Sequence, residues 1–409
     1  MAPRTSLPAI ILLALAVHGP LLLMQLPLHS YDANTHIFFA SHYANHWFDP
    51  WNLKWFAGFS QTTYPPLVHQ WIALFSHIMG LGLAYMLVQL IAILLLPVGM
   101  LRFARLWVDE RSATYAAIGS IFLGSLAMLV YQSGQLPNIF ASVLVLNALP
   151  YGYEWLRRGG FRDMLKALFI LLAAGAAHHV TALFGVILFA TPVIILAWLN
   201  RHDGVDEEDR QASTLGILGR TILLGVLLLI GIAIVLAPYW IQLRANPINQ
   251  APIAHGSRDN YLLNTFSGLN FWIIPWGAMM LAIPYIFWKG CTRLRLAPLF
   301  VFWWITTMIG LGGTTPVARF LLGRAFEVLT FERFTYWATL MALPFVGLLA
   351  AHLIERYSIK ALVGLSILSV LTCATSIAWT TFHPIANANF APDPIINFMN
   401  RDQHNRFRY

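Results

Sequence analysis

A carboxylate and a histidine stand four residues apart at the start of a polar, aromatic segment of this chain. Asp32 and His36 belong to the stretch from residue 29 to residue 77, which holds six of the fourteen histidines. On a helix, side chains four residues apart share one face, so these two groups would point the same way. A carboxylate beside a histidine is suited to proton transfer or to binding a metal ion.

Two interpretations of Asp32 are open at this stage. It can cap the helix that follows, because an aspartate accepts hydrogen bonds from the first free backbone amides. It can also be a functional group, since a carboxylate drawn to mid-bilayer depth costs about 2.5–3.5 kcal/mol and is kept mainly where it acts. His36, His42 and His46 are open to roles as ligands, proton relays or interfacial residues, and their spacing does not match a closed zinc site.

Apolar runs surround this segment and recur along the whole chain. Hydrophobic residues make up 58% of the 409 residues and charged residues 10%, against roughly 25% charged in a soluble domain. We therefore expect an all-α, polytopic membrane protein with about 11 transmembrane helices, each near the length that crosses a bilayer. The expected spans are 7–28, 81–101, 113–131, 136–156, 164–177, 179–199, 219–240, 270–288, 297–312, 334–353 and 361–380.

The basic residues predict how the chain is oriented. With a cytoplasmic N-terminus, sixteen Lys and Arg lie on the cytoplasmic side and nine on the other side, as the positive-inside rule favours. The long loops then lie outside, including the first one, residues 29–80. The net charge of +8 is mainly this topological signal. Because the cations are dispersed between spans, we expect a membrane-lipid environment and no nucleic-acid partner.

The chain is predicted to form one membrane domain, residues 1–380, followed by a polar outer tail at 381–409. That tail resembles the start of a soluble module that is missing here, or that a partner subunit supplies. Cys291 and Cys373 are too far apart to suggest a disulfide framework. No P-loop and no GxGxxG pattern is present, which argues against an ATP-driven or dinucleotide-dependent machine.

Other polar groups are predicted on the same outer side. Tyr64 precedes Pro65 and Pro66, which stiffen the return of the first loop into the membrane. A tight turn with Gln135 joins the third and fourth spans. The remaining candidates are two histidines at a junction of spans and two pairs of neighbouring charges, which are ion pairs or phosphate-binding groups: His178, His179, Arg258–Asp259 and Glu332–Arg333.

These motifs together resemble the GT-C superfamily of polytopic glycosyltransferases that use lipid-linked sugars. The similarity is carried by Tyr31–His36, the Trp-rich loop that follows and the TYPPL sequence at 63–67. In the GQLP, HHVTAL, APYW and ERF sequences at 134–137, 178–183, 237–240 and 332–334, the chain looks most like bacterial membrane proteins labelled "6-pyruvoyl-tetrahydropterin synthase-related". Nothing in it resembles the soluble zinc pterin enzyme.

The resemblance implies an inverting transferase of the bacterial cytoplasmic membrane that takes a sugar from a polyprenyl-phosphate carrier on the outer face. By position, Asp32 matches the first-loop carboxylate that acts as base or orients the acceptor, with His36 beside it. Tyr64, Gln135, His178, His179, Arg258, Glu332 and Arg333 are the implied carrier- and substrate-binding residues. No cofactor is clearly implied. A divalent metal at Asp32 and His36 stays open, because the loop from Gln132 to Asn138 lacks the second carboxylate of metal-dependent members.

Two other functions are open on the sequence alone. A transporter or flippase of lipid-linked or envelope precursors would use the intramembrane histidines and the Gly- and Pro-interrupted spans as a substrate path. A non-catalytic envelope-assembly protein would keep the fold without the reaction. Convergence of Asp32, His179 and Arg333 in one outer cavity would favour transfer, and a polar path to the cytoplasmic side would favour transport.

Overall fold

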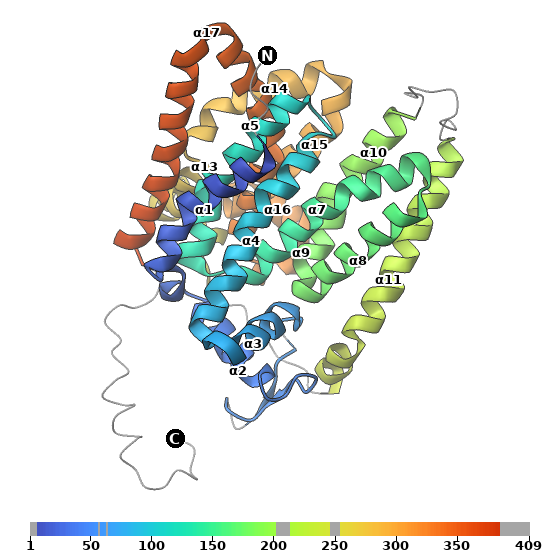
Figure 1. Cartoon of the computed structure of the whole chain (residues 1–409), viewed down its shortest axis with the longest axis vertical. Coiled ribbons are helices and arrows are strands. Elements are labelled where there is room, and N and C mark those ends of the chain that lie inside the picture. Colours follow the sequence, from blue (N-terminus) through green and yellow to red (C-terminus); the bar gives the residue numbers. More distant parts are fainter. Residues whose placement is uncertain (1–5, 56–57, 63, 202–212, 246–253, 385–409) are drawn as a thin grey trace.

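The protein is a bundle of long helices with a small cap of short elements at one end (Figure 1). The computed structural model describes residues 6–55, 58–62, 64–201, 213–245 and 254–384. The longer helices are α1 (Leu7–Leu23), α2 (Ala33–Tyr43), α3 (Leu67–Met79), α4 (Leu81–Ala104), α5 (Glu110–Ile121), α7 (Leu136–Arg158), α8 (Phe161–Ala177), α10 (Thr191–Leu199), α11 (Thr214–Ala245), α14 (Ile283–Thr292), α15 (Ala297–Gly310) and α17 (Glu332–Phe382).

Short helical turns and one small hairpin connect and extend these helices. The short α-helices are α6 (Gly124–Met128), α9 (His179–Phe184), α12 (Thr265–Gly268), α13 (Ile274–Trp276) and α16 (Pro316–Leu322). The 3-10 and π turns are η1 (Leu26–His29), η2 (Leu129–Ser133), η3 (Gly185–Ala190), η4 (Gly256–Arg258), η5 (Leu269–Ile273), η6 (Gly277–Ala282), η7 (Leu294–Leu296), η8 (Gly312–Thr314) and η9 (Gly323–Glu327). The strands β1 (Trp51–Asn52) and β2 (Phe59–Ser60) pair antiparallel.

The helices match the apolar runs of the sequence, so the prediction of an all-α membrane protein is confirmed. In the described residues, six helical stretches are long and apolar enough to cross a membrane: Leu81–Ala104, Glu110–Ser133, His179–Leu199, Thr214–Gln242, Thr265–Thr292 and Glu332–Phe382. Each of the eleven predicted spans falls on a helix, a run of helices or one arm of α17. The number of eleven crossings stays a prediction.

Helix α17 is two helices joined by a sharp bend. Ser358 has φ 50° and ψ −131°, a conformation that non-glycine residues rarely adopt. The bend turns α17 into the hairpin at the edge of the bundle in Figure 1. Its first arm is the buried centre of the protein, where Trp337, Leu340 and Phe345 are at most 1% exposed. The predicted spans at 334–353 and 361–380 correspond to the two arms.

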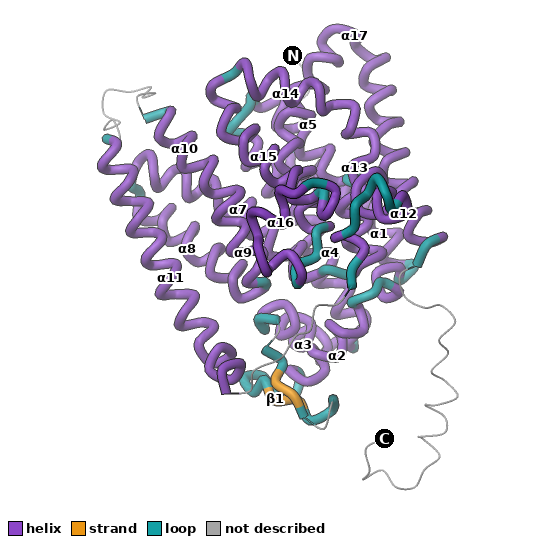
Figure 2. Tube along the Cα trace, turned by 180° about the vertical axis from the view of Figure 1, so that it is seen from behind, coloured by secondary structure: helices purple, strands orange, loops and turns teal. Residues whose placement is uncertain are grey.

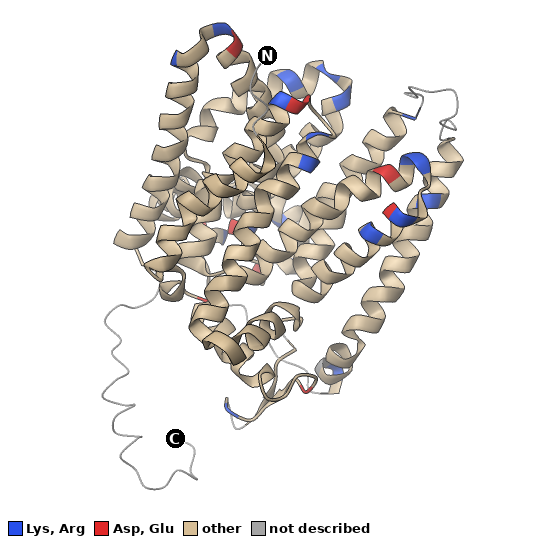
Figure 3. Ribbon diagram, viewed as in Figure 1, with Lys and Arg blue, Asp and Glu red and all other residues tan. Residues whose placement is uncertain are grey.

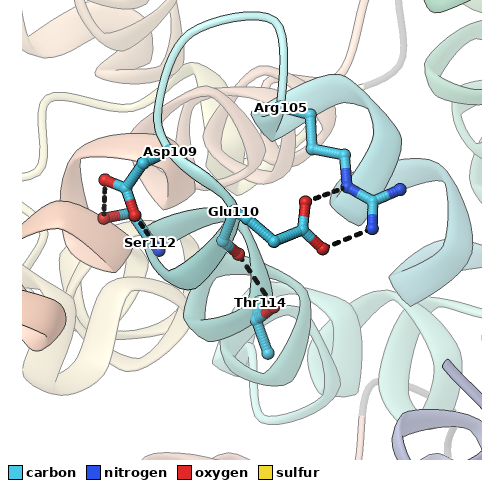
Figure 4. Close-up of polar contacts among 5 residues, drawn as sticks. All are labelled: Arg105, Asp109, Glu110, Ser112 and Thr114. Atoms are coloured by element: carbon cyan, nitrogen blue, oxygen red, sulfur yellow. Dashed lines mark hydrogen bonds and ion pairs between the residues drawn. The ribbon is translucent and has the colours of Figure 1, made fainter. Parts of the chain in front are cut away.

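Most Lys and Arg gather at the end of the bundle that includes this bend (Figure 3). The turn from α4 to α5 lies at the same end. There Asp109 caps α5 by accepting a hydrogen bond from the Ser112 amide at 3.0 Å. Arg105 donates two hydrogen bonds to the Glu110 carboxylate, from Nε to Oε2 at 2.6 Å and from Nη2 to Oε1 at 2.5 Å (Figure 4). This distribution supports the predicted cytoplasmic side, although the topology itself stays a prediction.

The first loop forms a cap at the opposite end of the bundle, where α2, the β1–β2 hairpin and α3 lie together (Figure 2). The predicted helix after Asp32 is present and ends at Tyr43. Pro66 occupies the N-cap position of α3, so the two prolines do form the corner at which the chain turns back. Of the predicted polar tail, residues 385–409 lie outside the described residues.

Candidate active site

A cavity of about 870 Å³ opens at the capped end of the bundle. Its walls come from segments far apart in the chain: the start of α2, the corner before α3, the α6–α7 turn, His178, the 254–271 segment and both ends of α17. Eight of the nine predicted site residues line it, namely Asp32, His36, Tyr64, Gln135, His178, Arg258, Glu332 and Arg333. The ninth, His179, is exposed and is not part of the lining.

The backbone of the α6–α7 turn places Asp32 in this cavity. The amides of Tyr31 and Asp32 donate hydrogen bonds to the carbonyls of Gln132 and Ser133, at 2.8 and 3.0 Å. Gly134 has φ 74°, and a Cβ there would lie 2.5 Å from Ser30 Oγ and 3.0 Å from the Asp32 nitrogen. Only glycine therefore allows the turn to close against the first loop. The GQLP sequence acts first as a positioning element.

The Asp32 carboxylate is not used to cap α2. Asp32 occupies the N-cap position, yet its side chain makes no capping hydrogen bond. Burial and the negative charge of Glu332 raise the pKa of Asp32 to about 7, while Arg333 acts in the opposite direction. A carboxylate with a pKa near neutrality is suited to accept a proton at physiological pH.

A chain of hydrogen bonds joins two walls of the cavity. Gln135 Nε2 donates to Glu332 Oε1, and Asn138 Nδ2 donates to Gln135 Oε1 at 3.1 Å. Thr181 Oγ1 donates to Asn138 Oδ1 at 2.7 Å and lies 2.6 Å from His178 Nδ1. This series of hydrogen bonds holds Glu332 and His178 at fixed positions around Asp32. Asn138 and Thr181 were not predicted, and only their nearness in sequence to Gln135 and His178 pointed to them.

The two cavity arginines have different surroundings. Arg333 donates from one terminal nitrogen to Thr330 Oγ1 at 2.9 Å, and its Nε is buried with no protein partner. Arg258 donates from Nε to the carbonyl of Leu329 at 3.0 Å and from Nη2 to that of Val328 at 3.4 Å. Arg258 therefore fastens the segment that leads into α17. Glu332 and Arg333 do not pair with each other: Glu332 bonds Gln135, and its Oε2 is buried without a protein partner.

Aromatic rings and histidines form the wall behind Asp32. The Tyr64 ring lies 5.4 Å from the His36 ring and 5.9 Å from the His178 ring, measured between centroids. Burial lowers the pKa of His36 to about 3 and that of His178 well below its usual value. Both rings are therefore neutral at physiological pH. His179 stacks on His178 at 5.9 Å but turns away from the cavity.

The described residues give no preformed metal site. Among them, no three His, Cys, Asp or Glu side chains come together as metal ligands. The α6–α7 turn contributes no carboxylate, as expected from its sequence. The second carboxylate beside Asp32 is Glu332, from α17.

Solved structures with the same arrangement of helices are membrane glycosyltransferases. The Archaeoglobus fulgidus oligosaccharyltransferase in the apo form superposes with a TM-score of 0.54 and 12% identity over 93% of this chain. ArnT from Cupriavidus metallidurans, also in the apo state, gives 0.53 and 14% over 88%. AglB from Archaeoglobus fulgidus, in complex with an inhibitory peptide and a dolichol-phosphate, gives 0.54 and 13% over 90%. The chain shares the helical fold of these proteins, so the expected GT-C-like fold is confirmed.

The likeness to these GT-C proteins concerns the fold and covers only part of them. This chain spans 55% of the apo oligosaccharyltransferase, 62% of ArnT and 54% of AglB in its complex. The archaeal oligosaccharyltransferase has also been solved in complex with Zn and sulfate. No family model and no curated protein sequence matches the chain. The resemblance to "6-pyruvoyl-tetrahydropterin synthase-related" proteins is thus not confirmed.

Proposed function

We propose that this protein is a glycosyltransferase that moves a sugar from a polyprenyl-phosphate carrier to an acceptor on the outer face of a bacterial cytoplasmic membrane. One observation carries the proposal: three polar atoms around Asp32 are buried without protein partners. They are His36 Nε2, Glu332 Oε2 and Arg333 Nε, all on residues that line the cavity. A buried polar atom left unpaired costs about 1–3 kcal/mol, so a polar ligand that pairs with these three atoms would be stabilised in the cavity.

The chemistry of the three atoms fits a sugar joined to a phosphate. The Glu332 carboxylate needs a donor, which a sugar hydroxyl supplies. The Arg333 Nε–H needs an acceptor, and phosphate oxygens are the acceptors that a guanidinium binds best. His36 Nε2 can take either role, depending on its tautomer. One cavity therefore offers complementary groups for both parts of a lipid-linked sugar.

The proposed reaction is a single displacement at the anomeric carbon. The acceptor hydroxyl loses its proton to the Asp32 carboxylate, and its oxygen forms the new bond to the anomeric carbon. The bond from that carbon to the phosphate oxygen breaks, and the electron pair leaves with the polyprenyl phosphate. Arg333 would stabilise the charge that develops on this phosphate. Attack opposite the leaving group inverts the anomeric centre. No step is assigned to a metal.

The structural neighbours support the class of donor. AglB has been solved with a dolichol-phosphate, which is a polyprenyl-type phosphate. The proposed donor is accordingly a polyprenyl-phosphate-linked sugar, with the chain of the carrier in the surrounding lipid.

The position of the cavity favours transfer over transport. Asp32, His178 and Arg333 converge in one cavity, with His178 in the place expected of His179. A second pocket, about 290 Å³, lies between α5, η6 and the arms of α17. Its lining is apolar apart from Ser369 and Thr372. Among the described residues, the lining of this second pocket is therefore poorly suited to carry a polar substrate.

The test is transfer of labelled sugar by the purified full chain in lipid nanodiscs. A panel of polyprenyl-phosphate sugars serves as donors, and a membrane extract serves as the acceptor pool. Asp32→Asn should lower the rate about 10²-fold or more, the usual worth of a positioned base. Asp49→Asn is the matched control, because Asp49 lies in the same loop but outside the cavity lining. Equal rates for Asp32→Asn and the wild type would contradict the proposal.

A further inference from the structure

A second histidine lies directly behind His36. His36 Nδ1 and His69 Nε2 are 3.0 Å apart, which is a hydrogen bond between two imidazoles that stand 33 residues apart in the chain. His36 is 1% exposed and His69 is 0% exposed. His36 lines the cavity and His69 does not. The proposed function gives His69 no role, and the sequence offered no sign of one.

The surroundings of His69 hold its ring in one orientation. It projects from the first turns of α3, just after the Pro65–Pro66 corner. The rings of Phe39, Tyr64 and Tyr43 surround it at centroid distances of 5.4, 5.8 and 6.4 Å. Burial lowers the pKa of His69 well below its usual value. The ring is therefore neutral and carries one proton.

Neutrality of both rings couples their tautomers. A neutral imidazole has one N–H and one bare nitrogen, so only one of the two rings can donate in the contact. If His69 donates from Nε2, His36 must carry its own proton on its other ring nitrogen, Nε2. If His36 donates from Nδ1, its Nε2 is bare and can only accept. The partner of one ring nitrogen thus decides what the other nitrogen can do.

We propose that His69 is a positioning residue: through its hydrogen bond it holds the His36 ring and sets whether His36 Nε2 donates to, or accepts from, the substrate beside Asp32. The proposal rests on the proposed function for its substrate. In this proposal the TYPPL corner does more than stiffen the loop, because it brings both Tyr64 and His69 into contact with His36. The neutral pair also leaves Asp32 as the group that takes the proton.

A double-mutant cycle tests whether His69 acts through His36. His69→Phe keeps a buried ring but removes the hydrogen bond, and it should lower kcat about tenfold with little change in KM, since one hydrogen bond of about 1.4 kcal/mol is lost. His69→Gln, which retains a donor and an acceptor, should recover part of the rate. In a His36→Ala background, His69→Phe should have no further effect. His77→Phe, at an exposed histidine of α3, is the control.

Two results would overturn the proposal. One is an additive loss in the double variant, which would mean that His69 acts independently of His36. The other is the same loss for His69→Gln as for His69→Phe, which would mean that the site needs only the shape of the histidine. Thermal unfolding of each variant in nanodiscs shows whether the protein is folded.

A spectroscopic measurement separates this proposal from the proposed function. In ¹⁵N-histidine-labelled protein, solid-state NMR distinguishes the two neutral tautomers of each ring, and the His36→Ala spectrum assigns the His36 signals. The wild type should show one tautomer for His36, and His69→Phe should show a mixture. An unchanged His36 signal in His69→Phe would refute the role of His69, whether or not any sugar is transferred. A single tautomer without transfer would refute the proposed function alone.

Discussion

The pH dependence of transfer should report the ionisation of Asp32. Burial and Glu332 raise the pKa of Asp32 to about 7, and only the ionised carboxylate can accept a proton. With that pKa, roughly one tenth of the protein carries an ionised Asp32 at pH 6, half at pH 7 and nine tenths at pH 8. The rate of transfer should therefore increase about fivefold from pH 6 to pH 7 and less than twofold from pH 7 to pH 8.

Removing the neighbouring charge should move this profile in a known direction. Glu332 raises the pKa of Asp32 because two nearby negative charges repel. Glu332→Gln keeps the shape and an oxygen that can accept from Gln135, but removes the charge. The midpoint should then lie below 7, and above the ordinary value of 3.8 because burial remains. Arg333→Gln should move the midpoint upward, since Arg333 lowers the pKa of Asp32.

The assay is kcat/KM for sugar transfer from pH 5 to pH 9, measured at constant ionic strength. Glu327→Gln is the matched control: Glu327 lies five residues earlier and pairs with Arg319 at 3.0 Å, and it has no part in the pKa shift of Asp32. Its profile should coincide with that of the wild type. A midpoint near 4 in the wild type, or one that is unchanged in Glu332→Gln, would refute the assignment of Asp32 as the base in an environment shared with Glu332.

Three further predictions use other parts of the structure. Arg333→Gln should weaken binding of a polyprenyl-phosphate carrier about 10- to 100-fold, as expected for a lost charge-assisted hydrogen bond, with little change in thermal unfolding in detergent; loss of stability with unchanged binding would speak against a phosphate ligand. A reporter inserted after Lys54 should be accessible from outside and one after Arg158 from inside; the opposite labelling would reverse the topology. Because the pKa of Asp32 is raised on folding, its stabilising contribution is complete below pH 3.8 and is lost as the pH rises through about 7. At pH 8, Asp32→Asn should therefore have a free energy of unfolding up to about 4 kcal/mol larger than that of the wild type, and a higher unfolding temperature. Equal stability at pH 8 would show that the carboxylate is not buried as described.

The apolar pattern was enough to predict the helices, because a membrane span depends on local composition and length. That Asp32 and His36 both line the cavity agrees with their spacing of four residues, which places both side chains on one face of a helix. The sequence did not predict that His178 lines the cavity and that His179 does not. His178 has φ −160° and ψ 104° between two helices, and of the two stacked rings only that of His178 lines the cavity. Such a break depends on how α8 and α9 pack, which a hydropathy pattern does not show.

The position of Glu332, the carboxylate beside Asp32, could not be predicted from the sequence. The resemblance to GT-C enzymes suggested such a carboxylate in the turn after the third span, and the sequence of that turn, Gln132 to Asn138, has none. Glu332 reaches the same place from α17 and is held there by Gln135, 197 residues earlier in the chain. From the sequence, Glu332 was a candidate either for an ion pair with its neighbour Arg333 or for binding the carrier and substrate, and neither prediction placed it beside Asp32. In the structure Glu332 and Arg333 each face Asp32 instead, with opposite effects on its pKa. Burial is therefore the main reason that the pKa of Asp32 lies near neutrality, and the two charges of α17 adjust that pKa in opposite directions.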